Sequence, residues 1–203
     1  EMIPDLLSPE IKSQAEKNLF HEFRDCETED HYIILHSLGL SEHVNNIFGE
    51  VDFVVICPQG VLCVEVKGGE VSCHKGVWSF TNRYGKKTEK PEGPFQQVQG
   101  NMQSLRGHLL KRLGKWDPLV SCQYASCVIM PECDFEYEGI EIIPEILFDK
   151  RHYHNLTETV DYSFSYWRNI LRAQHGFEGD GLSEEEMKRL ANLLRGDFHF
   201  VPS

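Results

Sequence analysis

Apolar residues recur with two different periods along the chain, and these periods predict its helices and strands. In residues 8–24 apolar side chains return every three or four positions, which predicts an amphipathic helix capped by Ser8. The same period over 95–113 and 157–174 predicts two longer helices. Ser183 begins a final helical stretch with the spacing of a capping box. Helices are therefore expected at both ends of the chain and near its middle.

Alternating and continuous apolar runs fill the remaining stretches and predict strands. HYIILHSLGL predicts a first strand, and DFVVI and VLCVEVK predict a hairpin around the turn sequence CPQG. GEVSCHKGVWSF predicts a second strand pair that turns at Lys75-Gly76, and RYGKKTEKPEGP predicts a polar loop. YASCVIMP predicts a buried strand, and IEIIPEILF predicts a short strand or a loop. This order predicts an α/β layered fold with a mixed central β-sheet flanked by helices.

The charged residues are segregated along the chain. The formal net charge of −12, taken alone, argues against a general nucleic-acid binder. Residues 67–116, however, hold ten Lys and Arg against three Asp and Glu, a balance of +7. From residue 132 onward seven bases face fifteen acids, a balance of −8. A solvated helix face explains part of this pattern, and a basic patch for phosphates explains all of it.

Length and composition limit the class of protein. The 203 residues suit one domain with a real core and a small appendage. The chain has no run of about 18 apolar residues and its first residues form no apolar signal core, so neither a membrane span nor secretion is expected. The seven cysteines form no CxxC pair, which favours free thiols in a reducing cytoplasm. We further expect the chain to be a piece of a longer protein.

Charged residues interrupt the apolar hairpin at its open end. With Cys57 and Gly60 at the corners of the turn, Asp52 faces Glu65 across the hairpin, and Lys67 lies on the same face. Two carboxylates facing each other in an apolar sheet repel, and they need a cation. Lys67 supplies one positive charge, whereas a divalent metal with oxygen ligands balances both carboxylates. A structural ion pair at the strand end is the alternative.

One further acid lies on the first predicted helix. Glu16 shares the apolar side of that helix with Phe20 and Phe23, which follow it one and two turns later. Its carboxylate either lies at the margin of the apolar stripe or points into a site on the sheet. The helical period alone does not decide between these two positions.

Taken together, these stretches resemble a known family. GEVDFVVICPQGVLCVEVKGG, the GVWS that follows it and the GPFQQ before the second helix are similar to the nuclease-related domain (NERD) family, a branch of the PD-(D/E)XK nucleases. The resemblance covers about residues 8–113 and implies a PD-(D/E)XK restriction-endonuclease-like core. It also implies a nuclease core over residues 1–131 and an α-helical extension over 132–203 that leads into a helicase-like domain.

The resemblance also assigns roles to particular residues. Asp52, Glu65 and the backbone carbonyl of Val66 are implied to hold Mg²⁺ or Mn²⁺. Gly93 stands where the family often has Asn, so Gln97 is alternatively a solvent-facing helix residue. The catalytic residues implied by the resemblance are Glu16, Asp52, Glu65, Lys67 and Gln97.

The implied activity is a Mg²⁺- or Mn²⁺-dependent deoxyribonuclease that hydrolyses phosphodiester bonds. Its partner would be DNA, with RNA not distinguished, and family members are often fused to helicases in DNA processing or in defence against foreign DNA. Trp78 or Tyr84 would stack on an unpaired base, unless these aromatic rings pack within the fold. The bases expected to contact phosphates are Lys75, Arg83, Lys86, Lys87 and Lys90.

Two other interpretations stay open. The first is a catalytically silent nuclease-fold module that binds nucleic acid or a protein partner. The second is a purely structural interaction domain, in which the cluster of Asp52, Glu65 and Lys67 has no chemical role. Metal-dependent DNA binding without cleavage would favour the first. DNA affinity that is unchanged after charge reversal of Lys86 and Lys87 would favour the second.

Overall fold

A six-stranded mixed β-sheet forms the centre of the molecule in the computed structural model, which describes residues 1–40, 49–82, 84–136, 139–176 and 179–196. The strand order is β1-β2-β3-β4-β8-β9. Strands β2, β3 and β4 are antiparallel, whereas β1, β8 and β9 join as parallel neighbours. The strands are β1 (Met2–Ile3), β2 (Ile33–Leu40), β3 (Gly49–Cys57), β4 (Gly60–Val66), β8 (Tyr124–Met130) and β9 (Leu147–Asp149). The predicted α/β fold with a mixed, helix-flanked sheet is confirmed.

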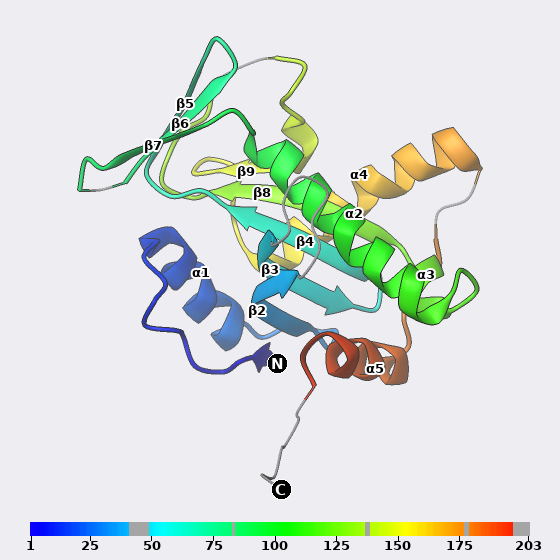
Figure 1. Ribbon diagram of the computed structural model, residues 1–203. Helices are drawn as coiled ribbons and strands as arrows, with labels where there is room; N and C mark the ends of the chain where they lie inside the picture. Colours follow the sequence, from blue (N-terminus) through cyan, green and yellow to red (C-terminus); the bar gives the residue numbers. More distant parts are fainter. Residues whose placement is uncertain (41–48, 83, 137–138, 177–178, 197–203) are drawn as a thin grey trace, which may run out of the picture.

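Helices cover both faces of this sheet (Figure 1). The long helix α2 crosses one face, while α1 and α4 lie on the other, and α5 packs against β2 and β3. The Tyr153 hydroxyl, just before α4, donates to Glu22 Oε1 of α1 at 2.5 Å and links these two helices. The helices are α1 (Gln14–Asp25), α2 (Pro94–Leu113), α3 (Pro118–Ser121), α4 (Leu156–His175), α5 (Glu184–Arg195) and the short 3₁₀ helix η1 (Pro144–Ile146).

The first helix begins later than predicted. Ser13 caps α1, and its hydroxyl accepts from the Glu16 amide at 3.3 Å. Ser8 instead accepts from the Glu10 amide in an isolated turn. Both serines satisfy the same sequence rule, but only Ser13 directly precedes the buried face of the helix. The predicted capping box at Ser183 is confirmed.

A separate three-stranded antiparallel sheet projects from the central one (Figure 1). It consists of β5 (Glu70–His74), β6 (Val77–Thr81) and β7 (Lys87–Lys90). The turn at Lys75-Gly76 occurs where predicted, with φ of 50° and 78°. The expected polar loop is wrong over 87–90, because these residues pair with β6 as an exposed edge strand. Both faces of that strand meet water, so no hydrophobic alternation marks it.

The core surrounds the β3–β4 hairpin, and every residue of β4 is buried. Trp78 is buried as well, and it stacks on Phe80 and Phe135 with ring centroids 6.5 and 6.3 Å apart. Trp78 is therefore a packing residue rather than a platform for a base. All seven cysteines are free thiols, as expected. Among the described residues, no helix combines the length and the apolar character that crossing a membrane requires.

The C-terminal part of the chain adds to the same sheet. After residue 131 the chain contributes β9, which pairs with β8, and α4 packs against β8. IEIIPEILF, expected as a short strand or a loop, contains η1 and runs into β9. The division at residue 131 into a nuclease core and an extension stays a prediction.

Candidate active site on the β3–β4 hairpin

Asp52 lies one position beyond the last regular pair of the hairpin. Strands β3 and β4 follow the register predicted from the CPQG turn as far as Phe53 and Val64. Beyond that pair, the Val66 amide donates to Asp52 Oδ2 at 2.7 Å. On the other side of Asp52, the regular β2–β3 pairing omits Ser37, which has a φ of 56°. The carboxylate of Asp52 thus occupies a gap between two ladders, on the face that carries Glu65.

Glu65 and Lys67 form a buried ion pair on that face. The Glu65 side chain is 1% exposed and the Lys67 side chain 14% exposed. The Lys67 ammonium donates to Glu65 Oε1 and, at 3.1 Å, to Gln97 Oε1 in the first turn of α2. The structure therefore brings Gln97 to the hairpin. Glu65 Oε2 is buried and finds no hydrogen-bond partner among the residues that the structure describes.

Glu16 reaches the same region from α1 and is held by a histidine. Its Oε1 lies 2.9 Å from His36 Nε2 of β2, and the Glu16 side chain is only 12% exposed. The His36 ring packs between Phe20 and Phe53, with both centroids 4.9 Å away. Glu16 therefore points toward the sheet rather than along the margin of its helix. Sequence reasoning missed His36, although a lone histidine in the apolar run YIILHSLGL is a signal worth following.

The buried charges act on one another. Burial raises the pKa of Asp52 well above its ordinary value, and the charges of Glu65 and Glu16 raise it further, while Lys67 opposes them. Burial also raises the pKa of Glu65, again against the opposing effect of Lys67. For Lys67, burial alone would lower the pKa, but Glu65 and Asp52 hold it above its ordinary value. One ammonium group is thus shared by an acidic cluster that needs more positive charge.

The donor set fits a hard divalent cation only in part. Two acids on one face and a buried carboxylate oxygen without a partner are what an oxygen-ligated ion requires. In the part of the chain that the structure describes, however, no three Asp, Glu, His or Cys side chains are grouped closely enough to hold a metal. Asp52, Glu65 and the Val66 carbonyl would therefore share such an ion with water.

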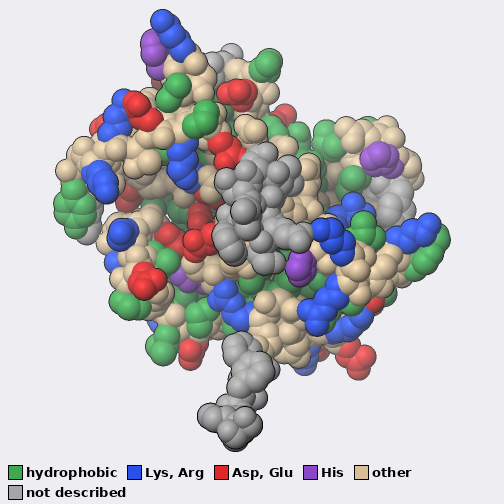
Figure 2. Space-filling view, in the orientation of Figure 1, with side chains coloured by type: hydrophobic (Ala, Val, Ile, Leu, Met, Phe, Trp, Pro, Cys, Tyr) green, Lys and Arg blue, Asp and Glu red, His purple; other side chains and the backbone are tan. Residues whose placement is uncertain are grey.

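An open cleft of about 290 Å³ adjoins the hairpin end. Its lining includes Lys67 and, from β7 and the turn before it, Lys90 and Lys86. The cleft also contains Lys12, which precedes α1 and which sequence reasoning missed. Figure 2 shows Lys and Arg side chains on both rims of the hollow between the three-stranded sheet and α1.

Two of the other predicted phosphate-binding residues, Lys87 and Lys75, lie outside the lining of this cleft. Lys87 forms an exposed ion pair with Glu89 at 2.5 Å, outside the cleft lining. Lys75 lies in the exposed β5–β6 turn. Arg83 lies outside the described residues. The structure thus gathers two of the five predicted bases, Lys86 and Lys90, beside Lys67.

The two glycines that follow Lys67 make close contacts that a side chain would block. A Cβ atom on Gly68 would lie 2.8 Å from Ala15 Cβ and 3.0 Å from Glu132 Oε2. The amide of Gly69, which has a φ of 77°, donates to the same Glu132 oxygen at 2.6 Å. This close approach of backbone to helix keeps α1, and with it Glu16, against the end of β4.

The comparison with family models decides the relationship. The model described as "Nuclease-related domain", NERD, matches residues 11–130, more than half of the chain. The chain belongs to the NERD family. Glu16, Asp52, Glu65, Lys67 and Gln97 all fall within the matched range. The NERD family is a branch of the PD-(D/E)XK nucleases, with which the mixed sheet and its flanking helices are consistent. No curated protein and no solved structure matches this NERD chain.

Proposed function

We propose that this NERD chain is a metal-dependent nuclease that hydrolyses phosphodiester bonds in DNA. The observation that carries the proposal is the buried Glu65 Oε2, for which the described residues supply no hydrogen-bond partner. Glu65 lies on the same face as Asp52, and Lys67 donates to its other oxygen. An unpartnered carboxylate oxygen in such a place costs stability unless a ligand satisfies it. A Mg²⁺ or Mn²⁺ ion is the ligand whose chemistry fits.

Each residue of the cluster has a role in this proposal. A bound Mg²⁺ or Mn²⁺ supplies an activated hydroxide and relieves negative charge on the phosphate. Asp52, Glu65 and the Val66 carbonyl would hold the ion. The Lys67 ammonium, fixed by Gln97 and Glu65, would orient the water and stabilise charge that develops on the phosphoryl oxygens. Glu16 would order a water molecule, with its orientation set by His36.

Cleavage of supercoiled plasmid and of single-stranded DNA tests the proposal directly. We expect cutting with Mg²⁺ or Mn²⁺ and none with EDTA. Asp52→Ala and Lys67→Ala should each lower the rate by about 100-fold or more. Lys188→Ala, which changes only an exposed ion pair on α5, is the control and should cut like the wild type. Undiminished cutting by the Asp52→Ala variant would refute the assignment of the site.

A silent binding module is the second candidate, and one observation favours it. The described residues group no three metal-ligating side chains, and Lys67 already neutralises part of the charge on Glu65. A folded wild type that binds DNA with Mg²⁺ but leaves it intact would support this module. Such binding should fall steeply as salt rises, because phosphate contacts release counterions.

The cellular setting forms a further part of the proposal. We propose that the nuclease works beside a helicase in the cytoplasm, in DNA processing or in defence against foreign DNA. Its support is the family relationship. Co-purification of a helicase with the protein is the expected result, and its absence would refute this part of the proposal.

A further inference from the structure

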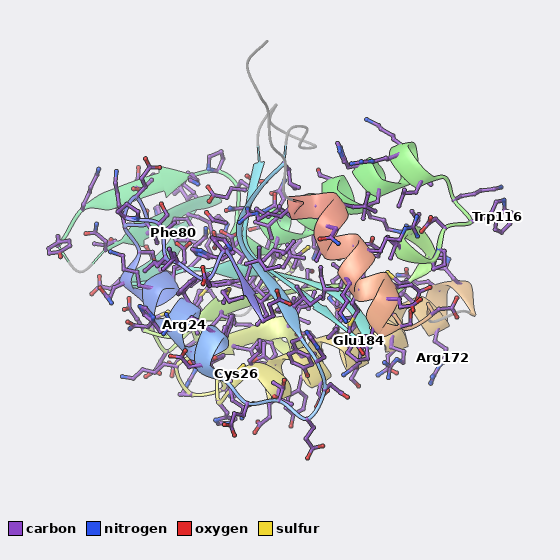
Figure 3. All side chains as sticks on the ribbon, turned by 90° about the horizontal axis from the view of Figure 1, so that it is seen from below. Arg24, Cys26, Phe80, Trp116, Arg172 and Glu184 are labelled. Atoms are coloured by element: carbon purple, nitrogen blue, oxygen red, sulfur yellow. The ribbon has the colours of Figure 1, made fainter. Side chains whose placement is uncertain are left out.

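The cleft beside Lys67 is lined on two sides by elements distant in sequence. One side is the segment Lys12–Gln14 at the start of α1, and the other is the β6–β7 turn and β7 with Lys86 and Lys90. Val66, Lys67 and the two glycines lie between them. Figure 3 shows Phe80 of β6 at the boundary between the three-stranded sheet and α1, and Lys67 Nζ lies 5.2 Å from the centre of its ring. The cleft therefore borders the candidate active site through Val66 and Lys67.

The cleft carries positive charge toward the acidic cluster. Among the described residues that line it, four are lysines, Lys12, Lys67, Lys86 and Lys90, and one is an acid, Glu132. That carboxylate accepts a hydrogen bond from the Gly69 amide. A polyanion bound by these lysines would therefore lie next to Lys67, at the open end of the hairpin.

Asn82, which follows β6, holds two backbone amides that precede β7. Asn82 Oδ1 accepts from the amides of Tyr84 and Lys86, both at 3.0 Å. This turn presents Tyr84, a cleft-lining residue that is 77% exposed. A tyrosine ring that is largely in water at the mouth of a basic cleft matches the stacking platforms of proteins that bind single strands. Bases in a duplex are stacked on their neighbours and do not offer this face.

We propose that the cleft takes an unpaired nucleic-acid strand, with phosphates on Lys12, Lys86 and Lys90 and a base stacked on Tyr84. This assignment of substrate class rests on the proposed nuclease function for its chemical purpose. The volume of about 290 Å³ lies at the lower end of the range for small-ligand pockets, which suits a nucleotide unit rather than a duplex. The strand would pass over Lys67 with a phosphate beside Glu65 and Asp52.

Binding measured without cleavage tests this inference separately from catalysis. Fluorescence anisotropy in EDTA would compare a labelled 20-nucleotide DNA strand with its blunt duplex. We expect the single strand to bind more tightly, and Tyr84→Ala to weaken it roughly tenfold while Tyr84→Phe leaves it unchanged. Tyr162→Ala is the matched control, because Tyr162 is also exposed but lies on α4 away from the cleft. Lys12→Ala should lower the salt slope of single-strand binding by about one.

The outcomes separate the inference from the proposed function. Single-strand preference that depends on Tyr84 supports the inference, even if no metal allows cleavage and the proposed nuclease fails. Equal or tighter duplex binding, or a Tyr84→Ala variant with wild-type affinity for the single strand, overturns it even if cleavage is observed. Absence of binding to either form overturns it as well. Thermal melting of Tyr84→Ala, expected to match the wild type because the side chain is exposed, excludes misfolding as the cause.

Discussion

At the scale of single residues, the candidate site holds together charges that repel. Asp52 is half-buried near Glu65 and Glu16, and all three are acids. Lys67 compensates for part of this repulsion, and the Val66 amide for another part. Clusters of like charges lower the stability of a fold, and acids whose pKa values are strongly shifted are candidates for functional residues. The free protein should therefore be more stable without the charge of Asp52.

Asp52→Asn tests this cost through its pH dependence. Burial and the neighbouring acids raise the pKa of Asp52 in the folded state above 3.8, its value in the unfolded chain. At pH values between 3.8 and this raised pKa, the folded state therefore binds more protons than the unfolded chain. Stability from this group is therefore lost as the pH rises through that window. In metal-free buffer the variant should be more stable than the wild type near pH 7, on the order of 1 kcal/mol, and the gap should shrink toward pH 3. Asn also keeps an oxygen for the Val66 amide.

Asp117→Asn is the control, because its effect on stability at neutral pH should be opposite to that of Asp52→Asn. The Arg189 guanidinium holds the pKa of Asp117 below its ordinary value, so its charge stabilises the fold at neutral pH. Denaturant melts of both variants across pH 3–8 should diverge in opposite directions. A destabilised, metal-free Asp52→Asn variant at pH 7 would contradict the account of the site.

At the scale of elements, the last helix supports the site from a distance in sequence. The Arg195 guanidinium at the end of α5 donates to the carbonyls of His36 and Ser37 at 2.7 and 2.8 Å. These carbonyls belong to the part of β2 where regular pairing is interrupted beside Asp52. His36 in turn holds Glu16. Helix α5 thus fixes the backbone that orients one acid of the cluster.

Arg195→Ala should loosen this backbone and lower both stability and activity. Two charge-assisted hydrogen bonds are lost, which lowers the free energy of unfolding by about 2 kcal/mol. Arg195→Lys should restore only part of the loss, because an ammonium group lacks the planar fork that spans two carbonyls. Urea denaturation measures the stability, and DNA cleavage measures the activity. Lys188→Ala, which removes an exposed ion pair on the same helix, should change neither, and an equal loss there would refute a specific role for Arg195.

Local sequence patterns predicted the β3–β4 hairpin, but not the residues from distant parts of the chain that pack around it. The turn CPQG and the apolar alternation set the β3–β4 register, because both act between neighbouring residues. The family resemblance then placed Lys67 and Gln97, which the structure joins at 3.1 Å. The ligands and the catalytic roles stay predictions.

Features that depend on tertiary packing were missed. His36 gains a role only because α1 brings Glu16 to β2, and Lys12 only because the chain before α1 lies opposite β7. Strand β7 carries no hydrophobic signal, since it is an edge strand in water. Ser13 and Ser8 are equivalent caps in sequence, and the docking of the helix decides between them.

At the scale of the whole molecule, Asp149 connects the C-terminal part of the chain to the sheet. It ends β9 and accepts from the Phe135 amide at 2.9 Å, from Arg151 and from His152 Nδ1 at 2.6 Å. Burial alone would raise the pKa of Asp149, but these donors hold it at about 2. The negative charge of Asp149 should therefore stabilise the packing of β9 and of the loop after β8 at neutral pH.

The free energy of unfolding, measured as a function of pH in the acid range, tests this role of Asp149. With a folded pKa of about 2 against 3.8 in the unfolded chain, Asp149 stabilises the fold above pH 4 and loses that effect as the pH falls to 2. Asp149→Asn should cost about 2 kcal/mol at pH 6, measured by urea denaturation. Wild type and variant should converge near pH 2. A gap of constant size from pH 6 to pH 2 would show that the side chain acts through packing rather than charge.

The tight contact at Gly68 has a consequence for how mutations in this protein should be read. Any side chain there meets Ala15 and Glu132, so substitution displaces the first helix even though glycine carries no reactive group. In a deep mutational scan scored by nuclease activity, position 68 should be as intolerant as the acids and the lysine. A scan scored by protein abundance should separate Gly68 from Asp52, because helix displacement at Gly68 lowers folding yield, whereas loss of the Asp52 charge is expected to raise stability. Intolerance to mutation alone would therefore overcount the chemical groups of this site by at least one glycine.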